Sequence, residues 1–248
     1  MLTYAIGDIH GQMELLQGAH ERIAQDRARE GVAEAEAPVV HIGDLVDRGP
    51  RSADVLSFLI SGQSAGANWL VLKGNHDRMF ARFLNDPMEP EPRLRRELNW
   101  LHERLGGLAT LESYGVDVAE DRPIAELHAD ALAAVPDSHR RFLAELPDRL
   151  RRDALILVHA GLRPKVKLEK QVEDDLVWIR DEFLNYRKSH GALVVHGHTP
   201  VPEAMHYGNR VNIDSGAAFG GPLTAVAIEG TRVFRLGARG REELLPIV

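Results

Sequence analysis

Cysteine is absent from the 248 residues of the chain. Its absence excludes disulfide bonds, thiolate nucleophiles, zinc fingers and iron–sulfur clusters, which all depend on that side chain. Long apolar runs are absent too, because no stretch approaches the ~20 residues of a membrane-spanning helix. The segment from Met1 to Ile6 is too short to be the apolar core of a signal peptide. We therefore expect a cytoplasmic protein that does not act in a membrane.

Basic residues are in the minority, since 30 Lys and Arg stand against 37 Asp and Glu, for a formal net charge of -7. Proteins that bind nucleic acids or membrane surfaces generally carry a basic excess or stripe, so we expect neither partner. Hydrophobic residues at 44% and charged residues at 27% are typical of a globular protein. We expect residues 1–248 to form a single domain, and the composition leaves its oligomeric state open.

The first part of the chain repeats one pattern three times. A short apolar run ends in a turn rich in glycine and aspartate, and an amphipathic stretch follows. The apolar runs occupy residues 2–6, 39–42 and 69–72. Strands that alternate with helices in this way predict βαβ units and a mainly parallel sheet.

Residues 86–150 break this pattern. Several prolines interrupt the chain, and residues 94–105 then have the spacing of an amphipathic helix that carries Trp100. We expect Trp100 to be a packing residue. Later prolines separate further short helices. The region is therefore predicted to be a helical insertion on the α/β core.

Strand patterns resume in the last part of the chain. Apolar runs at 154–158, 193–195 and 211–213 each end in a polar turn. Residues 223–228 and 232–236 predict a hairpin, which suggests a second, antiparallel sheet packed on the first. The predicted fold class is α/β, with a two-sheet β-sandwich flanked by helices.

Five of these strand ends carry side chains that can bind metal ions. They are Asp8, His10, Asp44, Asn75, His159 and His198. The carboxyl ends of parallel strands meet at one edge of a sheet, so the six side chains should converge. Nitrogen and oxygen ligands of this kind suit Mn²⁺, Fe and Zn²⁺. With one shared carboxylate, the six predicted ligands would hold two divalent ions.

Five short motifs occur in order along the chain. They are Gly-Asp-Ile-His-Gly at 7–11, Gly-Asp-Leu-Val-Asp-Arg-Gly at 43–49, Gly-Asn-His-Asp at 74–77, His-Ala-Gly-Leu at 159–162 and Gly-His-Thr at 197–199. This set resembles the calcineurin-like metallophosphoesterases. More narrowly, it is similar to the phosphoprotein phosphatase family, including its small bacterial and phage-type members. The resemblance implies the two-sheet metallophosphoesterase fold and a dinuclear metal centre.

The resemblance also implies a role for each matching residue. Asp8 and His10 would bind the first ion, Asp44 would bridge both ions, and the second site would be completed by Asn75, His159 and His198. A metal-bound hydroxide would then attack phosphorus directly, without a covalent phosphoenzyme. The expected cofactors are two divalent ions, with Mn²⁺ as the first expectation and Fe or Zn²⁺ as alternatives.

Four further residues are expected to act on the substrate. The resemblance makes His76 the general acid for the leaving oxygen, with Asp47 orienting it, and an unperturbed histidine pKa near neutrality suits that role. Arg48 would clamp the phosphoryl oxygens with its planar fork of donors. Family members use a second arginine from a later segment, and Arg180 is the best match.

Several residues near these motifs have more than one interpretation. His196 could lie behind the ligands or face the substrate. His41 is expected to be a core histidine or to support the ligands from behind. Asp77 stands where many family members have glutamate, so a hydrogen bond made there could shift. Asp174 and Asp175 read as a solvated pair of loop charges.

The substrate is less closely defined than the chemistry. The Asp-Arg-Gly sequence at 47–49 resembles phosphoprotein phosphatases, so phosphoserine or phosphothreonine proteins are the first expectation. The alternative is a symmetric diadenosine tetraphosphate hydrolase, whose substrate is a dinucleoside polyphosphate. Other phosphorylated small molecules come third. A non-catalytic binding module is disfavoured because all the ligands and the acid are present.

Overall fold

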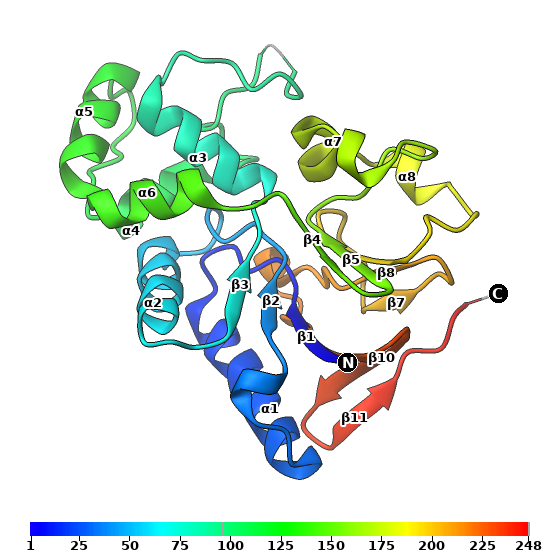
Figure 1. Ribbon diagram of the computed structural model, residues 1–248. Coiled ribbons are helices and arrows are strands. Elements are labelled where there is room, and N and C mark those ends of the chain that lie inside the picture. Colours follow the sequence, from blue (N-terminus) through cyan, green and yellow to red (C-terminus); the bar gives the residue numbers. More distant parts are fainter. Residues whose placement is uncertain (96, 248) are drawn as a thin grey trace.

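Two β-sheets lie face to face in the computed structural model, which describes residues 1–95 and 97–247 (Figure 1). The first sheet has the strand order β11–β10–β9–β1–β2–β3, and the second has the order β4–β5–β6–β8–β7. Helices flank the pair of sheets (Figure 1). The predicted α/β fold with two stacked sheets is therefore confirmed. That the whole chain forms one domain stays a prediction.

The first sheet joins three parallel strands to an antiparallel pair and an edge strand. Its strands are β1 (Leu2–Ile6), β2 (Val39–His41), β3 (Trp69–Val71), β9 (Ala225–Glu229), β10 (Arg232–Gly237) and β11 (Gly240–Glu243). β1 and β2 run parallel, with Tyr4 opposite Val39, and β2 and β3 run in the same direction. β9 is antiparallel to β1 and places Ala227 opposite Tyr4.

The second sheet is mixed. Its strands are β4 (Arg149–Arg152), β5 (Leu155–Val158), β6 (Leu193–His196), β7 (Met205–His206) and β8 (Arg210–Asn212). β5, β6 and β8 run parallel, whereas β4 and β7 are antiparallel edge strands. The carboxyl ends of β5 and β6 therefore lie at one edge of this sheet, as those of β1, β2 and β3 do in the first.

The expected antiparallel second sheet is wrong. The hairpin of β9 and β10 forms as predicted, but it extends the first sheet beside β1. The burial of β9 explains why the hairpin joins the first sheet. Val226 and Ile228 face the core between the sheets, while Ala225 and Ala227 face the helices. A strand that is apolar on both faces fits the interior of a covered sheet.

Alternation along the strands separates the cores. In β1, Ala5 belongs to the core between the two sheets, whereas Tyr4 and Ile6 belong to the core under the helices. A third core lies on the outer face of the second sheet, around Phe183. Each sheet thus buries both faces, which fixes the positions of its strand ends.

The helices form three groups around the sheets (Figure 1). Their bounds are α1 (Met13–Glu30), α2 (Ser52–Ser64), α3 (Asn75–Asn85), α4 (Gly107–Ser113), α5 (Ile124–Ala134), α6 (Asp137–Glu145), α7 (Glu173–Trp178) and α8 (Asp181–Leu184). α1 and α2 cover the first sheet, α7 and α8 cover the second, and α3 to α6 gather at one end (Figure 1). The helical insertion at 86–150 is present as α4 to α6.

The predicted helix at 94–105 is wrong, although residue 96 lies outside the described part of the chain. The described residues of this stretch form successive turns, in which Leu98 donates its N–H to the carbonyl of Arg95 and His102 donates to that of Asn99. The Asn99 side chain accepts the N–H of Leu101. Such a local bond competes with helix formation. Within the residues that the structure describes, no helix is both long and apolar enough to cross a membrane.

The prediction of Asp174 and Asp175 as a solvated loop pair is also wrong. Both residues lie in the first turn of α7, and Asp175 is buried. The Asp175 carboxylate accepts hydrogen bonds from the Nε and Nη2 of Arg163, both at 2.6 Å, and one from Arg93 at 2.8 Å. The side-chain hydrogen bond from Arg163 holds the pKa of Asp175 below its usual value despite burial.

Candidate dinuclear metal centre

The strand ends bring the six predicted ligands together. All six are buried, and they follow β1, β2, β3, β5 and β6: Asp8, His10, Asp44, Asn75, His159 and His198. Three of them have left-handed backbone conformations, with φ of 46° at His10, 50° at Asp44 and 66° at His198. Residues with side chains seldom adopt this region, and it is concentrated at functional sites.

Two glycines allow the turns to approach the carboxylates. A Cβ added to Gly197 would lie 1.9 Å from Oδ1 of Asp8, and one added to Gly74 would lie 2.2 Å from Oδ1 of Asp44. Any side chain at these positions would displace the carboxylate. The glycines of the motifs therefore serve close packing around the candidate ligands.

Asp44 lies between two groups of possible ligand atoms. It forms one group with His10 and His76 and another with His159 and His198, and within each group the atoms lie within 4.8 Å of one another. Its Oδ2 is 3.4 Å from Nε2 of His10, and its Oδ1 is 3.3 Å from Nε2 of His159. This position fits a carboxylate shared by two ions.

Backbone carbonyls orient two of the histidines. The Nδ1–H of His10 donates to the carbonyl of Val46 at 2.8 Å, and that of His159 donates to the carbonyl of Ile42 at 3.1 Å. In both rings Nε2 is left to face Asp44. Carbonyl partners of this kind commonly fix the tautomer of a metal-binding histidine.

The charges of the site fit cations. Asp8 accepts the backbone N–H of His198 at Oδ2, over 2.9 Å, but its buried Oδ1 has no hydrogen-bond partner among the described residues. Burial and the neighbouring Asp214 raise the pKa of Asp8 well above its usual value. A desolvated carboxylate oxygen without a donor is costly unless a cation compensates it.

The pKa of His159 also indicates that the site fits cations. Burial alone would lower its pKa, but the nearby carboxylates of Asp44 and Asp8 raise it to about 9. A protonated His159 can donate from Nε2 to Oδ1 of Asn75, which lies 3.0 Å away. A divalent ion between these carboxylates would take over the role of that proton. The donor set therefore fits two divalent ions.

The general-acid candidate is held by a buried carboxylate. Nδ1 of His76 donates to Oδ2 of Asp47 at 2.6 Å, so its Nε2 faces the candidate ligands. Asp47 also accepts the indole N–H of Trp100 at 2.8 Å and the hydroxyl of Thr110 at 2.7 Å. Burial raises the pKa of Asp47 to about 7, although the hydrogen bonds from Thr110 and Trp100 oppose the rise.

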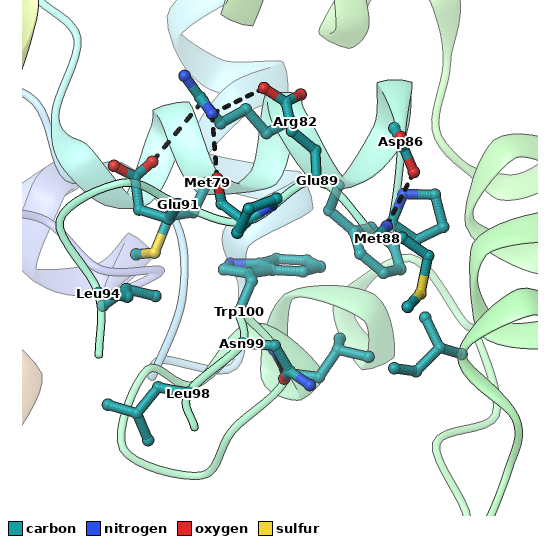
Figure 2. A pocket seen from close by; sticks show the side chains of 15 residues that line it. Met79, Arg82, Asp86, Met88, Glu89, Glu91, Leu94, Leu98, Asn99 and Trp100 are labelled. Carbon is teal, nitrogen blue, oxygen red and sulfur yellow. Dashed lines mark hydrogen bonds and ion pairs between the residues drawn. The ribbon is translucent and has the colours of Figure 1, made fainter. Parts of the chain in front are cut away.

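Trp100 and Thr110 come from the insertion and are the residues that the sequence analysis missed. Trp100 does more than pack, because one edge of its indole holds Asp47 while the ring lines a cavity of about 170 Å³ (Figure 2). Phe80 and Phe83 pack against the ring at centroid distances of 5.1 and 4.7 Å. The insertion thus builds the support of the candidate acid.

Both candidate arginines line a cavity of about 200 Å³ together with five of the six predicted ligands, all except His159. Arg48 donates from Nη1 to Nε2 of His10 at 2.5 Å and from Nη2 to Nε2 of His76 at 3.0 Å. Arg180 donates from Nε to Nε2 of His198 at 3.1 Å. Two guanidinium groups at one buried cluster are a ready binding site for a phosphoryl group.

The open interpretations are also resolved by contacts. His196 is fully buried, with Nε2 3.1 Å from Nη1 of Arg210, so it lies behind the pocket and does not face a substrate. His41 is a core histidine that contacts His20. The Asp77 carboxylate accepts the backbone N–H groups of Gly74 and Leu45, and the shorter side chain therefore holds the turn that carries His76.

Comparison with known proteins agrees with this geometry. The model of a family described as calcineurin-like phosphoesterase matches residues 1–221. The chain is 28% identical to the asymmetrical bis(5'-nucleosyl)-tetraphosphatase PrpE of Bacillus subtilis over 88% of this chain and 87% of that protein. It is also 28% identical to serine/threonine-protein phosphatase 1 of Salmonella typhimurium, over 92% of each chain.

A solved structure shares the fold. The cold-active protein-tyrosine phosphatase of a psychrophilic Shewanella species has a TM-score of 0.62 and 18% identity, over 98% of this chain and 80% of that chain. The family match covers most of the chain and all five motifs. The chain therefore belongs to the calcineurin-like phosphoesterase family and is a metal-dependent phosphoric ester hydrolase.

Proposed function

We propose that the chain hydrolyses a phosphoric anhydride or ester at the cluster around Asp44, with the six predicted ligands holding two divalent ions, Mn²⁺ first. The observation that carries the proposal is the position of Asp44, whose Oδ2 lies 3.4 Å from Nε2 of His10 and whose Oδ1 lies 3.3 Å from Nε2 of His159, so that it belongs to both groups of possible ligands. Arg48 lies beside the same cluster, between the candidate ligand His10 and the candidate acid His76. When bound, the two ions supply positive charge for the phosphoryl oxygens and lower the pKa of water.

The arginines would hold the phosphoryl group. Arg48 presents two edge N–H groups to the pocket, and Arg180 presents its Nε–H from the other side of the ligand cluster. A planar fork of donors matches the oxygens of a phosphoryl group in a way that an ammonium cannot. Their charge also offsets the charge that develops as the leaving oxygen departs.

His76 would pass a proton to that leaving oxygen. Its Nδ1–H is fixed by Asp47, so Nε2 is the atom that faces the pocket. In the structure this Nε2 accepts an N–H of Arg48, so His76 would take up its proton there when Arg48 turns to the phosphoryl oxygens. The bonds from Trp100 and Thr110 keep Asp47 in this orientation. Burial lowers the pKa of His76 from 6.5 to about 3, which departs from the near-neutral value expected from the sequence. The negative charge of a phosphoryl group bound beside Nε2 would raise this pKa toward the range that suits a general acid.

For the substrate, we propose a dinucleoside polyphosphate first and a phosphoserine or phosphothreonine protein second. This order reverses the expectation from the sequence. It rests on the Bacillus subtilis relative, whose name describes an asymmetrical tetraphosphatase. The second candidate, a phosphoprotein, is supported by the Salmonella phosphatase, which has the same 28% identity to this chain. It is also supported by the Asp-Arg-Gly motif of this chain, which contains Arg48.

The experiment is a side-by-side initial-rate assay of the Mn²⁺-loaded protein on diadenosine tetraphosphate and on a phosphothreonine peptide, with Asp44→Asn as the inactive control. A clear preference in kcat/KM for the dinucleotide supports the first candidate. ATP with AMP would mean asymmetrical cleavage, and two ADP would mean symmetrical cleavage. A preference for the peptide selects the second candidate. Hydrolysis of neither substrate overturns the proposal.

A further inference from the structure

Phe219 is a large apolar side chain that phosphoryl chemistry does not require. It is 67% exposed, although it lines the same pocket as Arg48 and His198. It ends the 3-10 turn Ala217–Phe219, in the connection between β8 and β9. A single exposed ring is ordinary on a protein surface. What distinguishes Phe219 is its position, because it lines the pocket that holds the candidate ligands and Arg48.

The loop that carries Phe219 is closed on itself. Glycines flank the turn on both sides, Gly216 with φ of 73° and Gly220 with φ of 83°, and both are left-handed. Gly221 donates its N–H to the carbonyl of Gly216 at 3.0 Å. At the base of the loop, the hydroxyl of Ser215 donates to the carbonyl of Pro222 at 2.6 Å. The backbone that carries the ring is therefore held in place at the mouth of the pocket before any substrate arrives.

Arg48 lies over this ring. Its guanidinium carbon is 5.1 Å from the ring centroid of Phe219, within the range of a cation–π contact. The edge N–H groups of the same guanidinium point to His10 and His76. Arg48 can thus rest on Phe219 and still donate into the pocket, so the phosphoryl position and the exposed ring are neighbours.

We infer that Phe219 is a stacking platform for a planar ring of the substrate, namely the purine base of a nucleoside polyphosphate. The inference rests on the proposed function and deepens it by naming the group that is recognised. A base linked through one sugar to the phosphate held by Arg48 can reach the neighbouring ring. A phosphoserine or phosphothreonine side chain has no ring at that distance.

The test compares the wild-type Mn²⁺-loaded enzyme with Phe219→Ala and Phe219→Trp on two substrates. Diadenosine tetraphosphate carries bases, and inorganic tripolyphosphate carries the phosphoanhydrides alone. Loss of a base–aromatic stack costs about tenfold in affinity. We therefore expect Phe219→Ala to lower kcat/KM by about tenfold on the dinucleotide, mainly through KM, and to leave tripolyphosphate within about twofold. Phe219→Trp should retain both activities.

An equal loss on both substrates would mean that Phe219 only positions Arg48, and no loss on the dinucleotide would mean that the ring is not used. Either result overturns the inference. A binding measurement distinguishes failure of the stacking inference from failure of the proposed function. By calorimetry, the wild type should bind AMP more tightly than inorganic phosphate, and Phe219→Ala should remove that preference. This holds even where no substrate is turned over, whereas equal ratios in both proteins contradict the platform.

Discussion

Trp100 and His76 share one acceptor, because the indole N–H and the imidazole Nδ1–H both donate to Oδ2 of Asp47, at 2.8 and 2.6 Å. Trp100→Phe keeps the apolar ring and removes the indole donor. A hydrogen bond to a charged group contributes about 1.5–3 kcal/mol, so we expect kcat to fall by about tenfold or more. Initial rates under saturating substrate measure the change.

The matched control for that variant is Trp69→Phe. Trp69 lies on β3 and packs against His20 and Phe58, away from the pocket. It should keep the wild-type kcat. If Trp100→Phe also keeps kcat, Asp47 does not need the insertion to orient His76.

Variants of Asp44 and His76 should distinguish a residue that binds metal from one that acts only in turnover. Asp44 lies in both ligand groups, so Asp44→Asn is expected to lose most of the bound metal and all measurable activity. His76→Asn should keep the metal content near that of the wild type, because all six predicted ligands remain in place, while kcat falls by about 10²–10⁴-fold. Elemental analysis measures the metal content, and initial rates on the same preparations measure kcat. Loss of metal in His76→Asn would make His76 a ligand.

Gly197 tests the close packing around Asp8. A Cβ at this position would lie 1.9 Å from Oδ1 of Asp8, so Gly197→Ala must displace the carboxylate. We expect metal affinity to fall by at least about tenfold, since one ligand is misplaced. The control is Gly18→Ala in α1, whose nearest neighbour would be an arginine tip at 3.5 Å. It should bind metal normally. Unchanged affinity in Gly197→Ala would exclude Asp8 as a ligand.

Arg78 ties the insertion to α3 and α7. Its guanidinium pairs with the buried Glu91, at the wall of the cavity in Figure 2, and donates to Asp174 at 2.7 Å. Among the residues that the structure describes, Arg78→Met leaves the Glu91 carboxylate with Arg82 as its one cationic neighbour, whose Nε is 3.7 Å away. Loss of one partner of a buried pair costs about 3–5 kcal/mol. Urea denaturation should show a loss of that order.

The double variant Arg78→Met with Glu91→Leu is the control for that prediction. It removes both charges, and an apolar replacement of a buried pair is often neutral. Most of the lost stability should therefore return. If the double variant is as unstable as the single one, packing around Arg78 matters more than the charge pair.

The site could be assembled from the sequence only as far as local rules reach. Ligands such as Asp8 and His159 follow apolar strands directly, and parallel strands bring such ends to one edge. Trp100 and Thr110 gave no such signal, since they bond to Asp47 across 53 and 63 residues. The roles of the six ligands themselves stay predictions until metal is measured.

The fold shows the same limit. The β9–β10 hairpin was predictable because adjacent strands with a short turn pair with each other. Its sheet was not, because the choice depends on the long-range pairing of β9 with β1. The stretch around Trp100 has helical spacing, yet the Asn99 side chain and the reach to Asp47 favour turns.

A pair of histidines under α1 and α2 makes stability depend on pH. His41 donates from Nδ1 to the carbonyl of Leu70 at 3.3 Å, so its Nε2 is an acceptor and receives the Nε2–H of His20 at 3.0 Å. His41 is therefore neutral in the folded chain. Burial lowers the pKa of His20 from 6.5 to about 4 and that of His41 well below 6.5.

The sign of the effect follows from proton uptake. Between pH 6.5 and 4 the unfolded chain protonates His20 while the folded chain does not, so the free energy of unfolding falls as the pH falls. Each proton contributes about 1.4 kcal/mol per pH unit, or about 2 kcal/mol between pH 6.5 and 5. His20→Gln keeps an N–H donor but does not titrate. Urea denaturation with chelator present, at pH 7.5 and 5, should show a drop that is smaller in His20→Gln by about that amount. Equal drops in both proteins would mean that the His20 pair is not what couples folding to pH.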